Sequence, residues 1–390
     1  MLTLKLAYRN LVGAGLRTWL NVGVLSFTYV LIIWHQGLFT GMYEQASRNY
    51  INDEIGGGQY WVDGYDPYDP LTLEDSHKVL PIALKELIGE KQAAPILIRQ
   101  GTIYPEGRVQ SVLIKGIDPA QKILDIPTES LNRDVTALPI VIGKIMAEKN
   151  HLRIGDTITL RWRDANGTFD AADGEIVEIM NSNVPTIDLG QLWVPLKKLR
   201  DMSGLENQAT IIVLGQEIKG QEGIPGWTFQ GHDFLLKDIR DMIKSKRFGG
   251  AFLYAILLFL AMLAIFDTQV LSIFRRRKEI GTLMALGMIR SRVVALFTIE
   301  GAMHGFLGIL LAALYGVPTL IYSAKTGIPL PATGEEYGFA ISTRLFPAYS
   351  AALVGGTILI VMITVIVVSY LPSRKISGLK PTEALKGKLS

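Results

Sequence analysis

The sequence contains no cysteine among its 390 residues. This absence excludes disulfide bonds and thiolate metal ligands, although it fits any cellular compartment. The five histidines show no spacing typical of a metal site, so we predict no metal in this chain. Neither a Gly-x-Ser-x-Gly elbow nor an HExxH motif stands out, and we therefore find no convincing enzyme site.

A phosphate-binding loop for ATP is also missing. That loop has the pattern G-x-x-x-x-G-K-[S/T], in which glycine backbone amides hold the phosphates. Gly-Lys occurs at 143–144 and at 387–388, and neither lysine is followed by Ser or Thr. We expect no cofactor in this chain. If ATP drives the protein, ATP and Mg²⁺ are bound by a separate ATPase subunit.

Charge is almost absent from four long windows of the chain. Each window exceeds the roughly 20 residues needed to cross the core of a bilayer, which favours four transmembrane helices over the buried helices of a soluble core. The first window is longer than the apolar part of a signal peptide, and no convincing cleavage site follows it, so we predict an uncleaved span. The four predicted spans are 19–41, 248–274, 293–322 and 349–371.

Cations are distributed unevenly between these spans, and cation-rich short loops stay in the cytoplasm. The segment 1–18, the loop 275–292 and the tail 372–390 are rich in Lys and Arg and poor in acids. Residues 42–247 instead carry 23 Lys+Arg and 30 Asp+Glu, a net charge of −7. We therefore predict that both termini and the 275–292 loop face the cytoplasm, whereas 42–247 and the loop 323–348 face outward.

Residues 42–247 have the pattern of a soluble α+β domain inserted between the first two spans. The spacing of apolar residues predicts a helix at 73–87. Helix-forming residues at 41–53 and an amphipathic pattern at 233–246 extend the two flanking spans outward as a stalk. Alternating or β-branched runs predict strands at 95–104, 109–116, 140–142, 157–162, 175–180, 192–194 and 209–214.

The ionisable residues inside the predicted spans include Asp267, Glu300 and His304. Such residues are costly in hydrocarbon and therefore point to a function. Asp267 precedes Arg275 by eight residues and Glu300 follows Arg292 by eight, which places both roughly 12 Å inside the cytoplasmic interface. Glu300 and His304 share a helix face. Hydrogen bonding between spans is favoured over a proton relay, and the role of Asp267 stays open.

The loop 275–292 combines cations with an apolar helical stripe. Its four consecutive cations, at 275–278, would anchor the chain at the interface and attract anionic lipid. The following EIGTLMAL spans about two helical turns and ends at Gly287. The loop is too short to bury the stripe, so we expect a partner protein to cover it. The residues assigned to this contact are Arg275, Arg276, Arg277, Lys278, Glu279, Ile280, Gly281, Leu283, Met284, Leu286 and Gly287.

Several segments resemble one family of membrane proteins. RRRKEIGTLMALG at 275–287 is similar to the R-R-x-E-I-[AG]-x-L-x-A-[LM]-G signature of FtsX/MacB-type ABC transporter permeases. FTIEGAMHGFLGILLAALYG in the third span and LPSRKISGLKPTEALK near the end resemble two further motifs of that family. VIGKIMAEKNHLRIGDTITL resembles its outer domain, so the likeness covers nearly the whole chain.

The resemblance implies a non-catalytic permease subunit of the bacterial inner membrane. It implies pairing with a second permease copy or a paralogue and with two ATPase subunits, on which the short helix is seated. ATPase closure would then move the stalk and rearrange the outer domain, a mechanism called mechanotransmission. The domain size, TGMYEQ at 40–45 and IKGIDP at 114–119 are most like the lipoprotein-releasing LolC/LolE permeases. MacB-like export of a peptide or small amphiphile and FtsX-like regulation of envelope enzymes are the alternatives.

We expect membrane lipid and a lipoprotein or amphiphile as partners, and no nucleic acid. For an acyl-chain substrate, the outer halves of the first two spans would offer an apolar cleft. The alternative is that these residues face lipid or the protein core. The residues proposed for the cleft are Leu38, Phe39, Met42, Phe252, Leu253 and Ile256.

Overall fold

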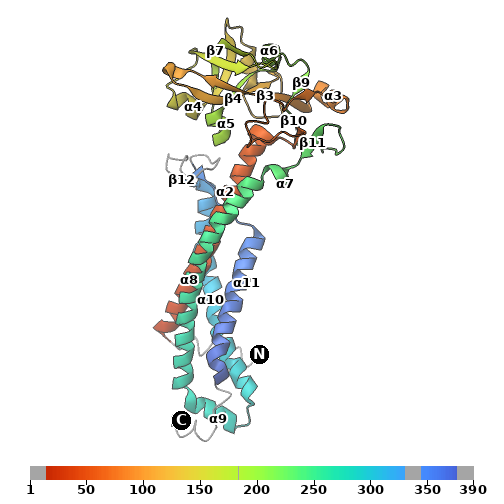
Figure 1. Cartoon of the computed structure of the whole chain (residues 1–390). Helices are drawn as coiled ribbons and strands as arrows, with labels where there is room; N and C mark the ends of the chain where they lie inside the picture. The colour runs from red at the N-terminus through yellow and green to blue at the C-terminus, as the bar shows by residue number, and fades with distance from the viewer. Residues whose placement is uncertain (1–14, 183, 330–343, 376–390) are drawn as a thin grey trace. The chain divides into compact units, whose positions relative to one another are not determined.

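The computed structural model describes residues 15–182, 184–329 and 344–375 (Figure 1). Its chain divides into two compact units. The helical unit consists of Met1–Met42, Met242–Ile328 and Leu345–Ser390, and the sheet unit of Tyr43–Asp241 and Pro329–Arg344. The first 14 residues of the predicted cytoplasmic segment, residues 330–343 of the predicted outer loop, and the tail from residue 376 lie outside the described residues.

The described chain has four helices that are long and apolar enough to cross a membrane, and they fit the four predicted spans in length and composition. The helices extend beyond the predicted limits at most ends, because polar residues next to an apolar span can continue its helical hydrogen bonding. A short fifth helix, α9 (Arg277–Ala285), separates the second and third of them (Figure 1). The four long helices are α2 (Leu16–Tyr50), α8 (Lys237–Arg275), α10 (Arg290–Thr326) and α11 (Ala351–Arg374).

The helical unit packs closely because α10 presents a row of small residues to its neighbours. A Cβ atom at Gly301 would overlap Ser369 of α11, and one at Gly308 would lie 3.0 Å from Cβ of Leu25 in α2. Small residues at this spacing let helix backbones approach each other. The buried apolar side chains of the unit come from all four long helices, including Ile32, Ala261, Ala312 and Val365.

Nine strands of the sheet unit form one sheet in the order β11-β1-β10-β3-β4-β8-β5-β7-β6. Because β3 pairs with β6 as well as with β4, the six strands from β3 to β6 close into a ring. The pairs β4–β8 and β5–β7 are parallel, and the others are antiparallel. The strands are β1 (Gln59–Val62), β3 (Ala93–Ile103), β4 (Gln110–Ile117), β5 (Leu138–Gly143), β6 (Thr157–Arg163), β7 (Phe169–Met180), β8 (Gln191–Pro195), β10 (Ile211–Leu214) and β11 (Trp227–Gln230).

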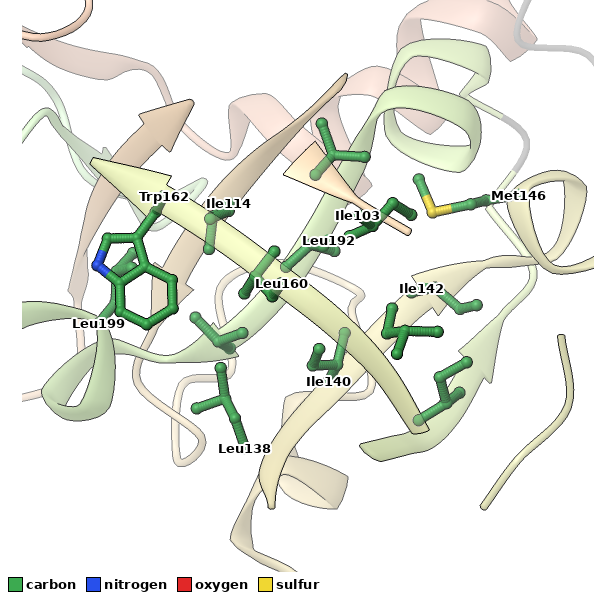
Figure 2. Packing of buried hydrophobic residues seen from close by; sticks show 14 of the residues in the cluster. Ile103, Ile114, Leu138, Ile140, Ile142, Met146, Leu160, Trp162, Leu192 and Leu199 are labelled. Atoms are coloured by element: carbon green, nitrogen blue, oxygen red, sulfur yellow. The ribbon is translucent and has the colours of Figure 1, made fainter. Parts of the chain in front are cut away.

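The inside of the ring is filled by apolar side chains from all six strands (Figure 2). Strand β6 shows the reason most clearly, because its residues alternate between exposed and buried, with Ile158, Leu160 and Trp162 turned inward. Met146 of α4 (Lys144–Lys149) and Leu199 of α6 (Leu196–Ser203) complete this cluster.

The seven predicted strand segments are all strands, although 209–214 contains the end of β9 (Gln208–Ala209) and the whole of β10. The predicted helix at 73–87 is wrong in its first half. Lys78–Val79 form strand β2, which pairs with β9, and helix α3 covers only Ile82–Gly89. Pro81 explains the difference, because a proline disfavours helical backbone at the residue before it.

The remaining described elements are short. They include a π-helical turn, two 3₁₀ turns, two short helices and a two-stranded pair. They are η1 (Ile51–Ile55), η2 (Pro105–Gly107), η3 (Thr128–Asn132), α5 (Pro185–Gly190), α7 (His232–Leu235), β12 (Ile328–Pro329) and β13 (Arg344–Leu345).

A buried carboxyl group ties two of the short helices together. Asp188 of α5 is buried, and its Oδ1 accepts a hydrogen bond from the backbone N–H of Ile145, 3.2 Å away at the start of α4. Burial raises the pKa of Asp188 to about 6, although backbone hydrogen bonds from α4 act in the opposite direction. The folded protein therefore binds a proton here more tightly than the unfolded chain does.

We predict that this proton makes the wild type lose stability as the pH rises from about 4 to about 6. The folded-state pKa lies above that of the unfolded chain, so the stabilisation is complete below the unfolded value and is lost through this window. Relative to Asp188→Asn, which has no charge to bury, the wild type should lose about 2 kcal/mol between pH 4 and pH 7. Urea unfolding of both proteins, followed by tryptophan fluorescence, measures this difference, and parallel pH profiles would contradict it.

Candidate coupling site

Helix α9 is a separate helix because the backbone bends at Arg276 and again at Gly287. Arg276 has φ −100° and ψ 18°, which interrupts the helical path from α8. At the other end, Gly287 has φ 91°, a left-handed conformation that glycine adopts without strain. Its N–H bonds to the carbonyl of Met284 at 3.1 Å, and the N–H of Met288 bonds to that of Leu283 at 3.0 Å. This is a Schellman C-cap, as the sequence predicted for Gly287.

One face of α9 is buried against its own neighbouring helices. Ile280 is 0% exposed and packs with Ile273 of α8 and with Val293 and Phe297 of α10. Met284 adds a partly buried contact to the same cluster. The expectation of an exposed stripe is therefore wrong for Ile280, because α8 and α10 supply the apolar surface that the loop itself lacks.

The exposed apolar surface of this hairpin lies at the far end of α9. Leu286 is 80% exposed and Ile289 is 58% exposed, whereas Leu283 is half-buried. We call Leu283, Leu286 and Ile289 the α9 tip. Ile289 was not predicted to belong to this contact, although an isoleucine between Gly287 and the charged start of α10 could have indicated an exposed apolar residue. The tip lies at and just beyond the end of α9, and a partner protein could bury its apolar side chains.

Arg276 connects α9 to the interior of the helical unit. Its Nη1 donates to both carboxylate oxygens of Glu300, at 3.2 and 3.0 Å, and its Nε donates to Oε2 of Glu279 at 2.7 Å. The guanidinium group also lies 5.0 Å from the ring centre of Phe297. Glu300 is 6% exposed, and a buried carboxylate needs such a partner. The ion pair with Glu300 therefore helps to fix the bend at which α9 leaves α8.

The other cations of the RRRK run have different surroundings. Arg275 and Lys278 are exposed, and Arg277 stacks on the ring of Phe274 at 4.9 Å. Gly281 is buried beside Ile280, on the inner face of α9. Of the four cations, Arg276 therefore makes a structural contact, whereas Arg275 and Lys278 form part of a charged outer surface.

His304 and Asp267, which also lie inside the spans, have contrasting surroundings. His304 is buried, and its Nδ1 lies 3.1 Å from the backbone carbonyl of Glu300. The Glu300 carboxylate is instead bound by Arg276, so Glu300 and His304 are not paired through their side chains. Asp267 lies on the exposed face of α8.

The residues proposed for an acyl-chain cleft fall into two groups. Leu38, Phe39 and Met42 of α2 are half-buried, whereas Phe252, Leu253 and Ile256 of α8 are exposed. Polar contacts hold the two helices together along this half of the unit. They are His35 Nδ1 to Tyr254 Oη at 2.7 Å and Arg247 Nη2 to Thr40 Oγ1 at 3.0 Å.

The turn that ends α2 is bonded to several parts of the sheet unit. Glu54 of η1 accepts a hydrogen bond at 2.9 Å from Lys115 of β4, whose side chain is 4% exposed. Lys115 also lies 5.2 Å from the ring centre of the buried Trp193. The N–H of Gly57 bonds to the carbonyl of Leu214 in β10 at 2.7 Å. These contacts attach the end of α2 rigidly to two strands.

The start of the returning chain is bonded to the same turn. Nε2 of His232 in α7 lies 2.8 Å from the carbonyl oxygen of Gly56. The chain entering the sheet unit and the chain leaving it therefore meet at η1. We call Glu54, Lys115 and the Gly56–His232 contact the stalk joint. No group of three or more His, Asp or Glu in the described part of the chain could hold a metal ion.

We predict that Arg276→Gln destabilises the protein by about 3 kcal/mol, because it leaves the Glu300 carboxylate buried without a partner. Adding Glu300→Gln should recover a large part of that loss, since no charge then remains buried. Arg275→Gln, at the exposed neighbouring arginine, is the control and should have little effect. Thermal unfolding midpoints of the purified variants in the same detergent give the order of their stabilities. A double variant less stable than Arg276→Gln would contradict the proposed pairing.

Comparisons with known proteins address the helical part most directly. Residues 251–381 match the family model described as FtsX-like permease C-terminal. An uncharacterized ABC transporter permease of Methanocaldococcus jannaschii is 28% identical over 133 residues, which cover 34% of this chain and 31% of that protein. The chain thus matches about a third of the length of this curated relative.

One solved structure similar to part of the chain is the extracellular domain of the noncanonic ABC-type transporter YknZ from Gram-positive bacteria. It is 15% identical, covers 41% of this chain and 83% of that chain, and has a TM-score of 0.26, which is too low to assign a fold. The family model and the curated relative agree on one class of protein. Residues 251–381 are therefore similar to an FtsX-like permease domain, and these matches support the FtsX/MacB family of ABC transporter permeases for this chain.

Proposed function

We propose that the chain is the non-catalytic permease subunit of an ABC transporter of the bacterial inner membrane, with both termini in the cytoplasm. The α9 hairpin then lies in the cytoplasm, and the sheet unit is an outer domain inserted between the first two spans. The cation-rich loop and the acidic sheet unit favour this orientation. A separate pair of ATPase subunits binds ATP and Mg²⁺.

The observation that carries this proposal is the α9 hairpin. Its inner face is anchored by Ile280 and by the Arg276–Glu300 pair, whereas Leu286 projects with 80% of its surface exposed. A rigidly held helix with an exposed apolar tip and surrounding cations is suited to a groove on another protein. We propose that the ATPase subunit provides this groove.

Force applied at α9 has a continuous path through the chain. Because α9 is fixed to the ends of α8 and α10, its displacement moves those helices as rigid bodies. Helix α8 runs without interruption from Lys237 to Arg275, and α2 runs from Leu16 to the stalk joint. The buried Glu54–Lys115 pair then passes movement of α2 to the sheet. We infer that the protein works by mechanotransmission.

A second permease subunit is proposed to pack against α8. Only 11% of the most apolar window of α8 is buried in this chain, against 44% for α2. Its exposed residues Phe252, Ile256, Phe259, Leu263 and Phe266 follow the alternating spacing of four and three typical of helix pairs. Asp267 adjoins this stripe, and a carboxylate facing lipid would be costly. A partner helix on this face relieves that cost.

Release of lipoproteins from the membrane is the substrate assignment that we propose. The half-buried Leu38, Phe39 and Met42 and the exposed Phe252, Leu253 and Ile256 would provide an apolar surface for acyl chains. Support for it comes from these apolar side chains and from the LolC/LolE-like TGMYEQ and IKGIDP segments. Export of a peptide or small amphiphile and mechanical regulation of envelope enzymes are the alternatives.

We predict that Leu286→Asp abolishes stimulation or restraint of the partner ATPase without unfolding the permease, because it places a charge at the α9 tip. Leu71→Asp makes the same change at a residue of similar exposure in the sheet unit and should leave coupling intact. The measurement is ATP turnover by the co-reconstituted ATPase in liposomes. Normal turnover control by Leu286→Asp would contradict the assignment of α9.

The same liposomes distinguish the three functions when a labelled lipoprotein and a soluble acceptor are added. ATP-dependent transfer to the acceptor is expected for lipoprotein release. ATP-dependent export of a peptide without such transfer would favour the MacB-like alternative. ATPase coupling without movement of any substrate would favour the mechanical regulator.

We predict that cysteines placed at Phe259 or Leu263 form disulfide cross-links between two copies in native membranes. The chain has no cysteine of its own, so each cross-link reports one position. Leu314→Cys, on the exposed face of α10, is the control and should stay monomeric under the same oxidation. Equal cross-linking at all three positions, or at none, would contradict a homodimer through α8. Cross-linking only to a different permease would indicate a paralogue.

A further inference from the structure

A groove on the outer surface of the helical unit lies between α10 and α11, close to α9. Its volume is about 530 Å³. It is hollow because α10 presents small residues there, namely Ser291, Ala295 and Thr298, at spacings of four and three. Tyr370 and Arg374 of α11 form the opposite wall, and Val294 and Ile299 complete it.

The polarity of the groove changes along its length. Ser291 at the start of α10 and Arg374 at the end of α11 both line it, and Arg290 and Arg292 flank Ser291 in the sequence of the first turn of α10. Seven residues further along α10, roughly 10 Å at 1.5 Å per residue, the wall is formed by Thr298 and Ile299. The Thr298 hydroxyl donates to the carbonyl of Val294 at 2.9 Å, so it offers little polarity to the groove.

We propose that this groove binds one anionic phospholipid of the membrane leaflet that contacts α9. The negatively charged headgroup lies against Arg374 and Ser291, and one acyl chain fills the space between Ala295, Thr298 and Tyr370. Charge complementarity selects this occupant, because the lining includes the cation Arg374 near the helix ends and apolar side chains further along α10. A neutral lipid would match only the apolar end, and a free phosphate only the cationic end.

The location of the groove connects the bound lipid to the packing that supports α9. Val294 packs both in the groove and in the cluster around Ile280, which supports α9. A lipid seated there would stabilise the start of α10 and, through it, the base of the hairpin. This inference depends on the proposed membrane orientation but not on the identity of the transported substrate.

The test is native mass spectrometry of the full chain in mild detergent, titrated with phosphatidylglycerol or phosphatidylcholine of the same acyl chains. The wild type should bind the first phosphatidylglycerol about fivefold more tightly than phosphatidylcholine, since a cation beside a headgroup contributes about 1 kcal/mol. Arg374→Gln should remove this preference. Lys375→Gln removes the same charge at the next residue, which does not line the groove, and should retain the preference.

A second pair of variants tests the apolar part of the groove. Ala295→Trp fills it without changing charge and should weaken the binding of both lipids. Leu314→Trp makes a large exposed change elsewhere on α10 and should leave binding unchanged. Size-exclusion profiles and thermal midpoints show that each variant is folded.

Three results would overturn the proposal. One is a wild type with equal affinity for both lipids. Another is an equal loss in Arg374→Gln and Lys375→Gln, which would indicate general surface charge. The third is unchanged binding by Ala295→Trp, which would show that no acyl chain occupies the groove. None of these results depends on ATPase coupling, so failure here is distinguishable from failure of the proposed transport function.

Discussion

The ion pair between Arg276 and Glu300 is the interaction on which the geometry of the helical unit depends. A buried carboxylate requires a partner, and Arg276, which sits at the bend between α8 and α9, supplies it to Glu300. That bend brings Ile280 onto Phe297, where it is fully buried. Two different forces, ion pairing and apolar packing, therefore hold α9 in one orientation.

The cations of the RRRK segment at 275–278 therefore have different roles. Arg276 faces inward and is structural, whereas Arg275 and Lys278 remain exposed for lipid or a partner. A second ion pair holds the stalk joint, just beyond the end of α2, where the buried Lys115 pairs with Glu54. Buried ion pairs contribute little net stability but tolerate few alternative geometries. They suit positions at which a helix must keep a fixed direction while it moves.

Much of the fold could be predicted from the sequence because hydrophobic patterns record local environment. The charge-free windows gave the four long helices, and alternation along 157–162 gave β6. The closure of the ring by β3 and β6 could not be predicted, because the sequence of a strand does not show which distant strand it pairs with. The helix predicted at 73–87 failed where Pro81 and pairing of β2 with β9 overrode periodicity.

The candidate site was predicted in position but not in detail. The motif at 275–287 identified α9, and Gly287 correctly marked its end. Which face of α9 is covered depends on α8 and α10, which lie beyond the motif, so the burial of Ile280 and the exposure of Leu286 had to come from the structure. Likewise, eight-residue spacing placed Glu300 near the loop, but only the folded chain shows Arg276 as its partner.

The central claim is that movement at α9 reaches the sheet unit through continuous helices. Spin labels at Leu71→Cys in both copies of the reconstituted complex would report the distance between the two sheet units, since the chain has no other cysteine. Mechanotransmission predicts that this distance changes between the ADP and ATP states, and that the change disappears in Leu286→Asp. An unchanged distance in a complex whose ATPase is still controlled by the permease would contradict it.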